Sequence, residues 1–381
     1  MTKNLSRRDA CARLAAAAVA IAAAPRRASA ATAAAGPSGA TASSPLVVAF
    51  VYVTPIGEAG WTYQHELGRR ELVRALGARV RTIAVESVAE GADAERVLRD
   101  LVAQQGAGLV FATSFGYLDP ALRVAADFPA VRFEHAGGYK SAPNLATYDA
   151  RYYEARWLAG WLAGRTSASG IGGYVAGMPV PEVVQGIDAF ALGMRAANPK
   201  ATVRVIWLDT WFDPAKERAA AQTLIDGGAD VLTHHSASTA VAQAAQANFR
   251  SRGVRVVSYP SDMRAFAPDA QLAAIVHRWG GFYTRTAQNV LDGSWRPEPV
   301  WGGIASGMVD IDAVDPQLAA DIRAGLGARR DAIVAGTLVP FAAPLVDNAG
   351  RTRLARGALA DADIKSMNWF VAGVVGTVPA R

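Results

Sequence analysis

The residues best suited to chemistry are two adjacent histidines and one aspartate. His234 and His235 end one apolar run, and Asp262 follows the next such run along the chain. Histidines and a carboxylate could hold a metal or act as an acid–base set, but no third ligand of suitable spacing follows the histidines and no nucleophile adjoins either loop. We therefore expect no metal site and no catalytic residue, and we interpret His235 and Asp262 as hydrogen-bonding residues of a binding site.

Enzyme and cofactor motifs are missing from the sequence. It contains no Gly-x-x-x-x-Gly-Lys-Ser/Thr loop, no His-Glu-x-x-His and no Gly-x-Ser-x-Gly. The run GIGGYVAG at residues 170–177 resembles a dinucleotide-binding loop, but Val175 replaces its third glycine and the glycines precede the expected strand. We expect a protein that is not an enzyme and needs no cofactor.

Aromatic residues gather instead on segments expected to be loops after strands. Large rings bury much apolar area, so a set of them on such loops indicates a hydrophobic slot for a flat ligand. A single aromatic of this kind more often packs its own loop, and only the set favours a binding site. The rings are Trp61, Phe115, Tyr117, Tyr139, Trp211, Phe212 and Trp279, and candidate hydrogen-bonding partners at the ligand's edge are Glu58, Asn144, Glu182, Asp213, His235, Ser238 and Asp262.

The segments that must position these residues alternate between short apolar runs and helix-length stretches. This alternation predicts parallel sheets covered by helices on both faces. Ligands of such sheets bind beyond the carboxyl ends of the strands, where the aromatic loops lie. The expected strands are Leu46–Val53, Val80–Val85, Gly108–Ala112, Ala130–Glu134, Gly173–Ala176, Val203–Leu208, Asp230–Thr233, Val254–Tyr259 and Leu272–Val276.

Two lobes are expected from the length and from an internal repeat. About 335 residues follow the first 45. A chain of this length is usually too long to fold around a single hydrophobic core. Residues 94–137 and 216–261 both read as helix, glycine turn, strand, polar loop, helix, strand. We expect an N-terminal lobe of residues 46–152 plus 280–298, and a C-terminal lobe and tail of residues 153–279 plus 299–381.

The first 45 residues carry targeting information. Ser6-Arg7-Arg8 opens a basic region, residues 14–24 form an apolar run too short to span a bilayer, and Ala28-Ser29-Ala30 suits cleavage. We expect a twin-arginine-like export signal over residues 1–30 and a flexible linker over 31–45. The only cysteine, Cys11, precedes the apolar run, so we expect no lipid-anchoring cysteine and a soluble periplasmic protein.

The basic character of the chain belongs to this signal. Removal of residues 1–30 takes away six basic residues and one acid, which lowers the formal net charge from +6 to about +1. A nearly neutral mature chain loses the electrostatic basis for binding nucleic acid. We expect no nucleic-acid partner.

Seven segments follow one another in a distinctive order, namely GWTYQHELG, TSFGYLDPA, NLATYDARYYEARWLAGWLAG, GGYVAGMPVPEVVQGIDAFALGMRAANP, TWFDPAKERAAAQTLIDGGADVLTHHSAS, PFAAPLVDNAG and MNWFVAGVVG. In the order of these segments the chain resembles the basic membrane protein (BMP) family, from about Leu46 to the C-terminus. Members of this family are substrate-binding components of ABC importers with the type I periplasmic-binding-protein fold, and several bind purine nucleosides or bases.

The resemblance implies a role for particular residues. The family holds its heterocycle between two phenylalanines, whose places are taken here by Trp61 and Trp211, and its late carboxylate and its Phe-Gly loop match Asp262 and Phe115-Gly116. Members that bind nucleosides carry Asp-x-Ser-Phe-Asn on the first loop, where residues 58–62 read Glu-Ala-Gly-Trp-Thr, and no lysine lies near Trp279. These departures remove ribose contacts and favour a free purine base such as adenine over a nucleoside.

The resemblance also implies a function and its partners. We expect a monomeric periplasmic receptor that delivers a purine-like ligand to an ABC permease in the membrane, without transforming it. A purine nucleoside receptor of the same fold is the alternative, and a nucleoside-processing enzyme is a weaker one. The complete expected binding set is Trp61, Phe115, Tyr117, Asn144, Glu182, Trp211, His235, Asp262 and Trp279.

Overall fold

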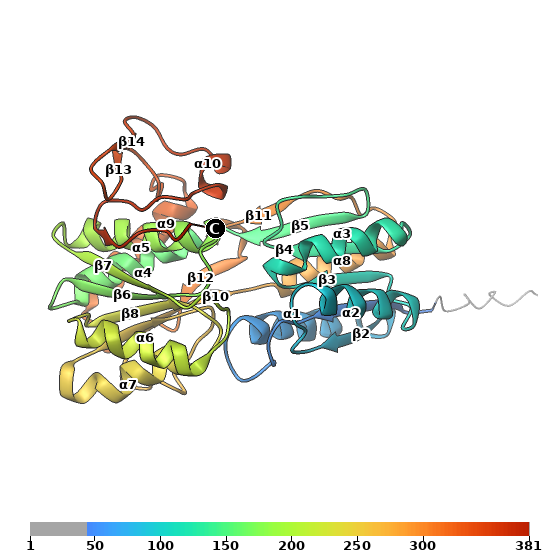
Figure 1. Cartoon of the computed structure of the whole chain (residues 1–381), viewed down its shortest axis with the longest axis horizontal. Helices are drawn as coiled ribbons and strands as arrows, with labels where there is room; N and C mark the ends of the chain where they lie inside the picture. Colours follow the sequence, from blue (N-terminus) through green and yellow to red (C-terminus); the bar gives the residue numbers. More distant parts are fainter. Residues whose placement is uncertain (1–43, 381) are drawn as a thin grey trace, which may run out of the picture. The chain divides into compact units, whose positions relative to one another are not determined.

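The first lobe is built on a six-stranded sheet (Figure 1). The computed structural model describes residues 44–380, so the expected export signal and nearly all of the expected linker lie outside the described residues. Every pairing in this sheet is parallel. Its strands, in spatial order, are β11 (Val300–Gly302), β5 (Leu145–Ala150), β4 (Arg132–Ala136), β3 (Leu109–Ala112), β1 (Leu46–Val51) and β2 (Val80–Val85).

The second lobe is built on a seven-stranded sheet, in which only β12 runs antiparallel to its neighbour. The parallel order confirms the α/β class with two doubly wound lobes. Its strands, in spatial order, are β12 (Val309–Asp312), β10 (Gln271–His277), β9 (Arg255–Ser258), β8 (Val231–His235), β6 (Ile171–Ala176), β7 (Thr202–Trp207) and β15 (Val374–Val375).

Helices cover both faces of each sheet. In the first lobe, α1 (Trp61–Leu76) and α8 (Gly280–Leu291) share one apolar cluster with the sheet, and α2 (Ala92–Ala103) and α3 (Leu118–Asp127) share another. In the second lobe, α4 (Tyr152–Thr166), α5 (Pro181–Ala197) and α9 (Ala320–Val334) lie on one face, and α6 (Pro214–Asp226) and α7 (Ala240–Arg252) lie on the other. Shorter elements are the 3₁₀ turns η1 (Gly77–Arg79), η2 (Phe115–Tyr117) and η3 (Ile304–Ser306), the hairpin β13 (Leu345–Val346) and β14 (Thr352–Leu354), and α10 (Asp361–Lys365).

The tightest helix pair is α4 against α5. A Cβ atom added at Gly160 of α4 would overlap the carbonyl oxygen of Phe190, and one added at Gly193 of α5 would overlap that of Trp157. Two glycines therefore let the backbones of these helices touch. Since α4 begins at the crossover from the first lobe and α5 begins at the carboxyl end of β6, this packing fixes the start of both helices beside the same cleft.

The structure confirms the repeat and extends the strand list. Residues 94–137 contain most of α2 followed by β3, α3 and β4, and residues 216–261 contain most of α6 followed by β8, α7 and β9. The sequence interpretation missed six strands, namely β5, β11, β12, β13, β14 and β15. The expected lobe boundary at residues 298–299 requires correction, because β11 pairs with β5 and so belongs to the first sheet.

The C-terminal segment packs on the second lobe. Strand β15 pairs with β7, and the ring of Phe370 stacks on Trp207 at 6.4 Å between centroids. The backbone N–H of Val371 donates to the buried carboxyl of Asp188. Among residues 44–380 no helix combines the length and the hydropathy needed to cross a bilayer.

A buried carboxyl in the first sheet gives the fold a measurable pH dependence. Glu134 of β4 is 4% exposed and accepts a 2.8 Å hydrogen bond from Nε1 of Trp295. Burial raises the pKa of Glu134 to about 8, so the folded protein retains a proton that the unfolded chain releases near the ordinary value of 4.5. The stability of the fold should therefore fall as the pH rises from about 4.5 to about 8.

We expect Glu134→Gln to stabilise the protein at neutral and alkaline pH. Glutamine keeps an oxygen for Trp295 and never ionises, so the gain should reach at most ~3 kcal/mol near pH 7 and should disappear near pH 4. Urea unfolding at several pH values would measure it, with Glu298→Gln at an exposed position as the control. A gain of the same size at every pH would contradict the assignment.

Candidate functional site

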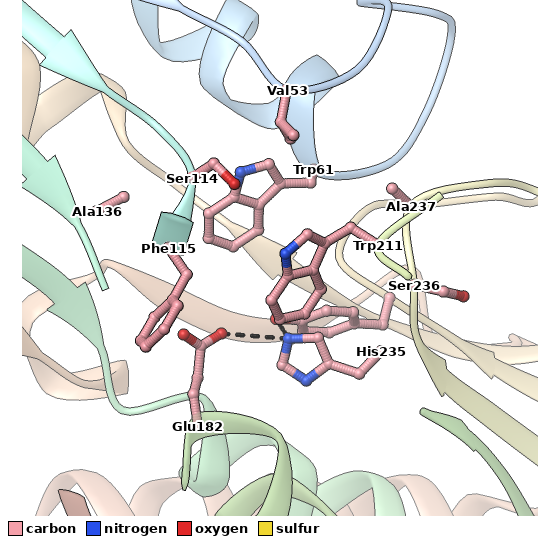
Figure 2. Close-up of a pocket in the computed structure, with 11 residues that line it drawn as sticks. Val53, Trp61, Ser114, Phe115, Ala136, Glu182, Trp211, His235, Ser236 and Ala237 are labelled. Atoms are coloured by element: carbon pink, nitrogen blue, oxygen red, sulfur yellow. Dashed lines mark hydrogen bonds and ion pairs between the residues drawn. The ribbon is translucent and has the colours of Figure 1, made fainter. Parts of the chain in front are cut away.

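A pocket lies between the two lobes at the carboxyl ends of their strands (Figure 2). About 500 Å³ of space lies between its walls, part of it open to solvent. The first lobe contributes residues at or after the carboxyl ends of β1, β3 and β4, and the second lobe contributes residues at or after those of β6, β7, β8 and β9. The lining residues are Val53, Trp61, Ser114, Phe115, Ala136, Glu182, Trp211, His235, Ser236, Ala237 and Tyr259.

Trp61 is held rigidly at the start of α1. Its Nε1 donates to the carbonyl of Thr113 at 2.7 Å. Its ring meets those of His65 and His277 edge-on, at 4.6 and 5.5 Å between centroids, and His65 in turn stacks parallel to Trp279. One part of the indole is thus backed by other rings while another part lines the pocket.

Trp211 reaches the pocket from the loop between β7 and α6. Asp213 ends this loop as the N-cap of α6, accepting from the backbone N–H groups of Ala215 and Lys216. The Trp211 carbonyl accepts from the N–H of Ala237 at 2.9 Å. A Cβ atom at Gly177 would lie 3.0 Å from the indole, so the absence of a side chain there lets the ring lie against the backbone.

Phe115 lies on the opposite side of the pocket from Trp211 in Figure 2. Its loop is fastened by Glu90, whose Oε1 accepts from Oγ of Ser114 at 2.6 Å and from the backbone N–H of Gly116 at 2.9 Å. These two hydrogen bonds hold the turn η2, from which the phenyl ring of Phe115 reaches the pocket. Glu90 was not among the residues expected from sequence, and it acts on the pocket only through this loop.

The polar end of the pocket is formed by Glu182, His235 and Tyr259. Oε1 of Glu182 lies 3.2 Å from Nε2 of His235 (Figure 2). The same nitrogen lies 3.1 Å from the hydroxyl of Tyr259. Burial raises the pKa of Glu182 to about 7, and burial holds the pKa of His235 well below its usual value. Near neutral pH the imidazole is therefore neutral, and the carboxyl titrates.

Glu182 also owes its position to the helix that carries it. Proline occupies the first position of α5, and Glu182 lies in the first turn. The N-terminus of a helix favours a negative charge, which opposes the effect of burial on this carboxyl. The side chain is partly reachable from the pocket, with 14% of it exposed.

The structure brings five of the nine expected residues to one pocket, namely Trp61, Phe115, Glu182, Trp211 and His235. It places the other four elsewhere. Trp279 is 1% exposed and packs behind Trp61. Tyr117 is buried, and its hydroxyl donates to the carbonyl of Val88 at 2.5 Å.

Asn144 and Asp262 need the same correction. The amide of Asn144 donates to the carbonyls of Ala125, Phe128 and Val131, so it closes the end of α3. Asp262 accepts from Nε2 of Gln271 and lines a separate groove on the other side of Trp279. Neither side chain lines the aromatic pocket.

Sequence reasoning missed the small and apolar members of the lining, which are Val53, Ser114, Ala136, Ser236, Ala237 and Tyr259. All except Val53 and Tyr259 are small, so their types carry no signal. Their place at or shortly after the ends of expected strands was the only available sign. Ser236 is held by buried Glu217, which also accepts from the Ser238 hydroxyl and thereby shapes the loop after β8.

The lobes touch at the mouth of the pocket. The backbone N–H of Gly60 donates to Oγ of Ser261 across the cleft at 2.8 Å. Gly60 has φ of 96°, and a Cβ atom there would overlap the carbonyl oxygen of Ala237 in the second lobe. The closed arrangement thus requires a residue without a side chain directly before Trp61.

Taken together, the geometry suits binding of a flat molecule. Four aromatic rings and an acid–imidazole pair enclose the space, and within residues 44–380 no cluster of three or more His, Cys, Asp or Glu residues is suited to a metal. Residues 46–335 match the Bmp family, described as ABC transporter substrate-binding protein PnrA-like. The chain belongs to this family. It is a substrate-binding protein of an ABC transporter.

Related proteins support the assignment to the Bmp family. The chain is 46% identical to a purine-binding protein of Brucella abortus (strain 2308), over 89% of this chain and 96% of that protein. It is 35% identical, over 91% of this chain and 83% of the other, to a Haloferax volcanii protein whose name assigns it to glucose binding for an ABC transporter. The two relatives thus share the family but are named for different ligands.

Solved structures support the fold. An ABC transporter solute-binding protein from Conexibacter woesei superposes with a TM-score of 0.63 at 22% identity, covering 77% of this chain and 98% of the other. One from Aeropyrum pernix K1 gives a TM-score of 0.65 at 18% identity, covering 79% and 94%. These similarities confirm the type I periplasmic-binding-protein fold.

We expect Gly60→Ala to hold the lobes apart. The added methyl would meet the Ala237 carbonyl, and the positive φ would add strain, whereas Gly57→Ala adds strain at a φ of 57° but meets no atom of the other lobe within 4 Å. Gly57→Ala is therefore the matched control. Residues 44–380 contain no cysteine, so spin labels at Arg96→Cys and Arg218→Cys, one on each lobe, would report the interlobe distance.

The distance distribution should lengthen for Gly60→Ala and stay near that of the parent for Gly57→Ala. Identical distributions in both variants would show that this contact does not limit closure.

Proposed function

We propose that this Bmp-family protein is a receptor for a free purine base, adenine or a close analogue, which it binds between Trp61 and Trp211. The observation that carries the proposal is that these two indoles, from opposite lobes, line one pocket that ends in a carboxyl and an imidazole. The Brucella relative named for purine binding supports the ligand class.

The composition of the pocket favours a heterocycle over a sugar. Stacking on an aromatic ring is worth about 1–3 kcal/mol per base and suits any flat ring. A hexose presents hydroxyls around its whole rim and leaves buried groups unpaired wherever the protein offers no partner. Polar side chains in this lining are confined to Ser114, Glu182, His235, Ser236 and Tyr259, and three of them, Glu182, His235 and Tyr259, lie together at one end.

Selection among bases then rests on the polar end. An ionised Glu182 accepts a hydrogen bond from a ring N–H or an exocyclic amine, both of which adenine carries. An analogue that presents an acceptor there would leave two acceptors facing each other, at a cost of about 1–3 kcal/mol. Base discrimination therefore requires Glu182 more than either indole.

The mechanism is binding coupled to lobe closure. A base stacks on the ring of one lobe, and closure brings the ring of the other lobe onto its second face while Gly60 meets Ser261. Closure drives no reaction, since the ligand leaves unchanged. An ABC permease recognises the closed form. We place the receptor in the periplasm as a monomer after export.

Both indoles should be needed for affinity. We expect Trp61→Ala and Trp211→Ala each to weaken adenine binding by about 1–3 kcal/mol, roughly 5- to 150-fold, because each removes one stacking face. Isothermal titration calorimetry would measure the loss. Trp369→Ala, at a half-buried site on the C-terminal segment, is the control and should bind as the parent does.

A ligand panel would test the class. Adenine should bind more tightly than adenosine and much more tightly than glucose, and adenosine should be recovered intact after incubation. Tight glucose binding with weak purine binding would overturn the proposal in favour of the sugar class of the Haloferax relative. Release of adenine from adenosine would show an enzyme.

A further inference from the structure

A buried arginine lies behind the polar end of the pocket. Arg156 of α4 has no exposed surface, and within residues 44–380 its guanidinium has no carboxylate partner within 4 Å. A buried charge without a counter-ion is costly, so its retention calls for a role that a neutral residue could not fill.

Neutral groups hold the guanidinium in place. Nη1 donates to Oγ1 of Thr233 at 3.0 Å, and Nη2 donates to the carbonyl of His234 at 2.9 Å. The guanidinium carbon lies 3.7 Å from the centroid of the Tyr259 ring, a close cation–π contact. Nε has no hydrogen-bond partner among the described residues.

These contacts connect Arg156 to the ligand end of the pocket without exposing it there. Tyr259, which covers the guanidinium, places its hydroxyl 3.1 Å from Nε2 of His235, and that nitrogen lies 3.2 Å from Oε1 of Glu182. The Tyr259 ring therefore separates the buried cation from the pocket, and His235 and Glu182 continue this line of contacts along the polar end. The interior has a low dielectric constant, so the charge acts over this distance with little screening.

We propose that Arg156 is a positioning residue that acts through Tyr259 and His235 to hold Glu182 in its hydrogen-bond-accepting form, so that the receptor selects ligands with an N–H edge. This inference rests on the proposed function and adds to it the residue that keeps Glu182, the group that recognises the ligand, in its ionised form. A positive charge favours the ionised carboxylate and disfavours a charged imidazole.

Among the charged groups around Glu182, Arg156 favours its ionisation. Burial, and secondarily the neighbouring Glu182, raise the pKa of Asp149 at the end of β5 well above its usual value. Neutral His235 and the hydroxyls of Tyr152, Tyr174 and Tyr259 surround the carboxyl, and Lys365 of α10 lines the adjoining recess that Glu182 also borders. Burial raises the pKa of Glu182 to about 7 and Arg156 lowers it, so loss of Arg156 must move the pKa upward.

The test is the pH dependence of adenine affinity between about pH 5.5 and 8.5, a range that spans the Glu182 titration. In the parent protein, affinity should rise with pH through about 7 and then level off, because the ionised form accepts from the ligand. Affinity that falls as pH rises would overturn the inference without any variant.

Arg156→Met should move this rise in affinity to higher pH. For each pH unit of displacement the adenine affinity at pH 7 should fall about tenfold. At the alkaline end of the range the affinity should recover toward that of the parent. Arg156→Lys, which keeps the charge, should restore much of the parental profile. Arg165→Met, on the exposed face of the same helix, is the matched control and should leave the profile unchanged.

A purely structural role for Arg156 would lower affinity equally at every pH, which would overturn the inference. If Arg156→Met does not fold, Glu182→Gln decides, because it removes the titrating group and should flatten the profile. A profile that keeps its slope in Glu182→Gln would count against the inference. Absence of purine binding at any pH would refute the proposed function instead.

Discussion

The pocket depends on one close contact between the lobes. The backbone of Gly60 lies against the backbone of Ala237 in the opposite lobe, with no side chain between them. Its N–H also donates to the hydroxyl of Ser261 in that lobe. Trp61 is the residue directly after Gly60, and the backbone N–H of Ala237 donates a hydrogen bond to the carbonyl of Trp211. The same contact therefore sets how far apart the two indoles stand, and so the thickness of the molecule that fits.

Burial then sets the electrostatics of the interior. All five histidines of the chain are buried, and in every one burial lowers the pKa, which favours the neutral ring. Three of them, His65, His235 and His277, pack against tryptophan or tyrosine rings. His65 stacks on Trp279, and His277 stacks on Tyr152. Charge enters this region mainly through Arg156 and Glu182, and of these two only Glu182 lines the pocket. Burial raises the pKa of the nearby Asp149 well above its usual value.

The helix pair α4 and α5 links the fold to this arrangement. Its glycine contacts bring the backbones together, which places the helix that carries Arg156 beside the helix that begins with Glu182. Electrostatic control of the ligand end thus arises from a packing feature of the second lobe. Glu134, the other carboxyl with a strongly raised pKa discussed above, lies in the first sheet and affects stability rather than the pocket.

The sequence by itself determined the class and most of the strands, because runs of apolar β-branched residues between helix-length segments can be buried only in a two-sided parallel sheet. It also indicated that Trp61, Phe115 and Trp211 lie beyond the carboxyl ends of strands, where ligands of such sheets bind. Only the tertiary structure decided which polar residues join them. Asn144 and Asp262 looked equivalent to Glu182 in the sequence, since a side chain's type shows that it seeks hydrogen bonds but does not show whether local carbonyls and amides already satisfy it.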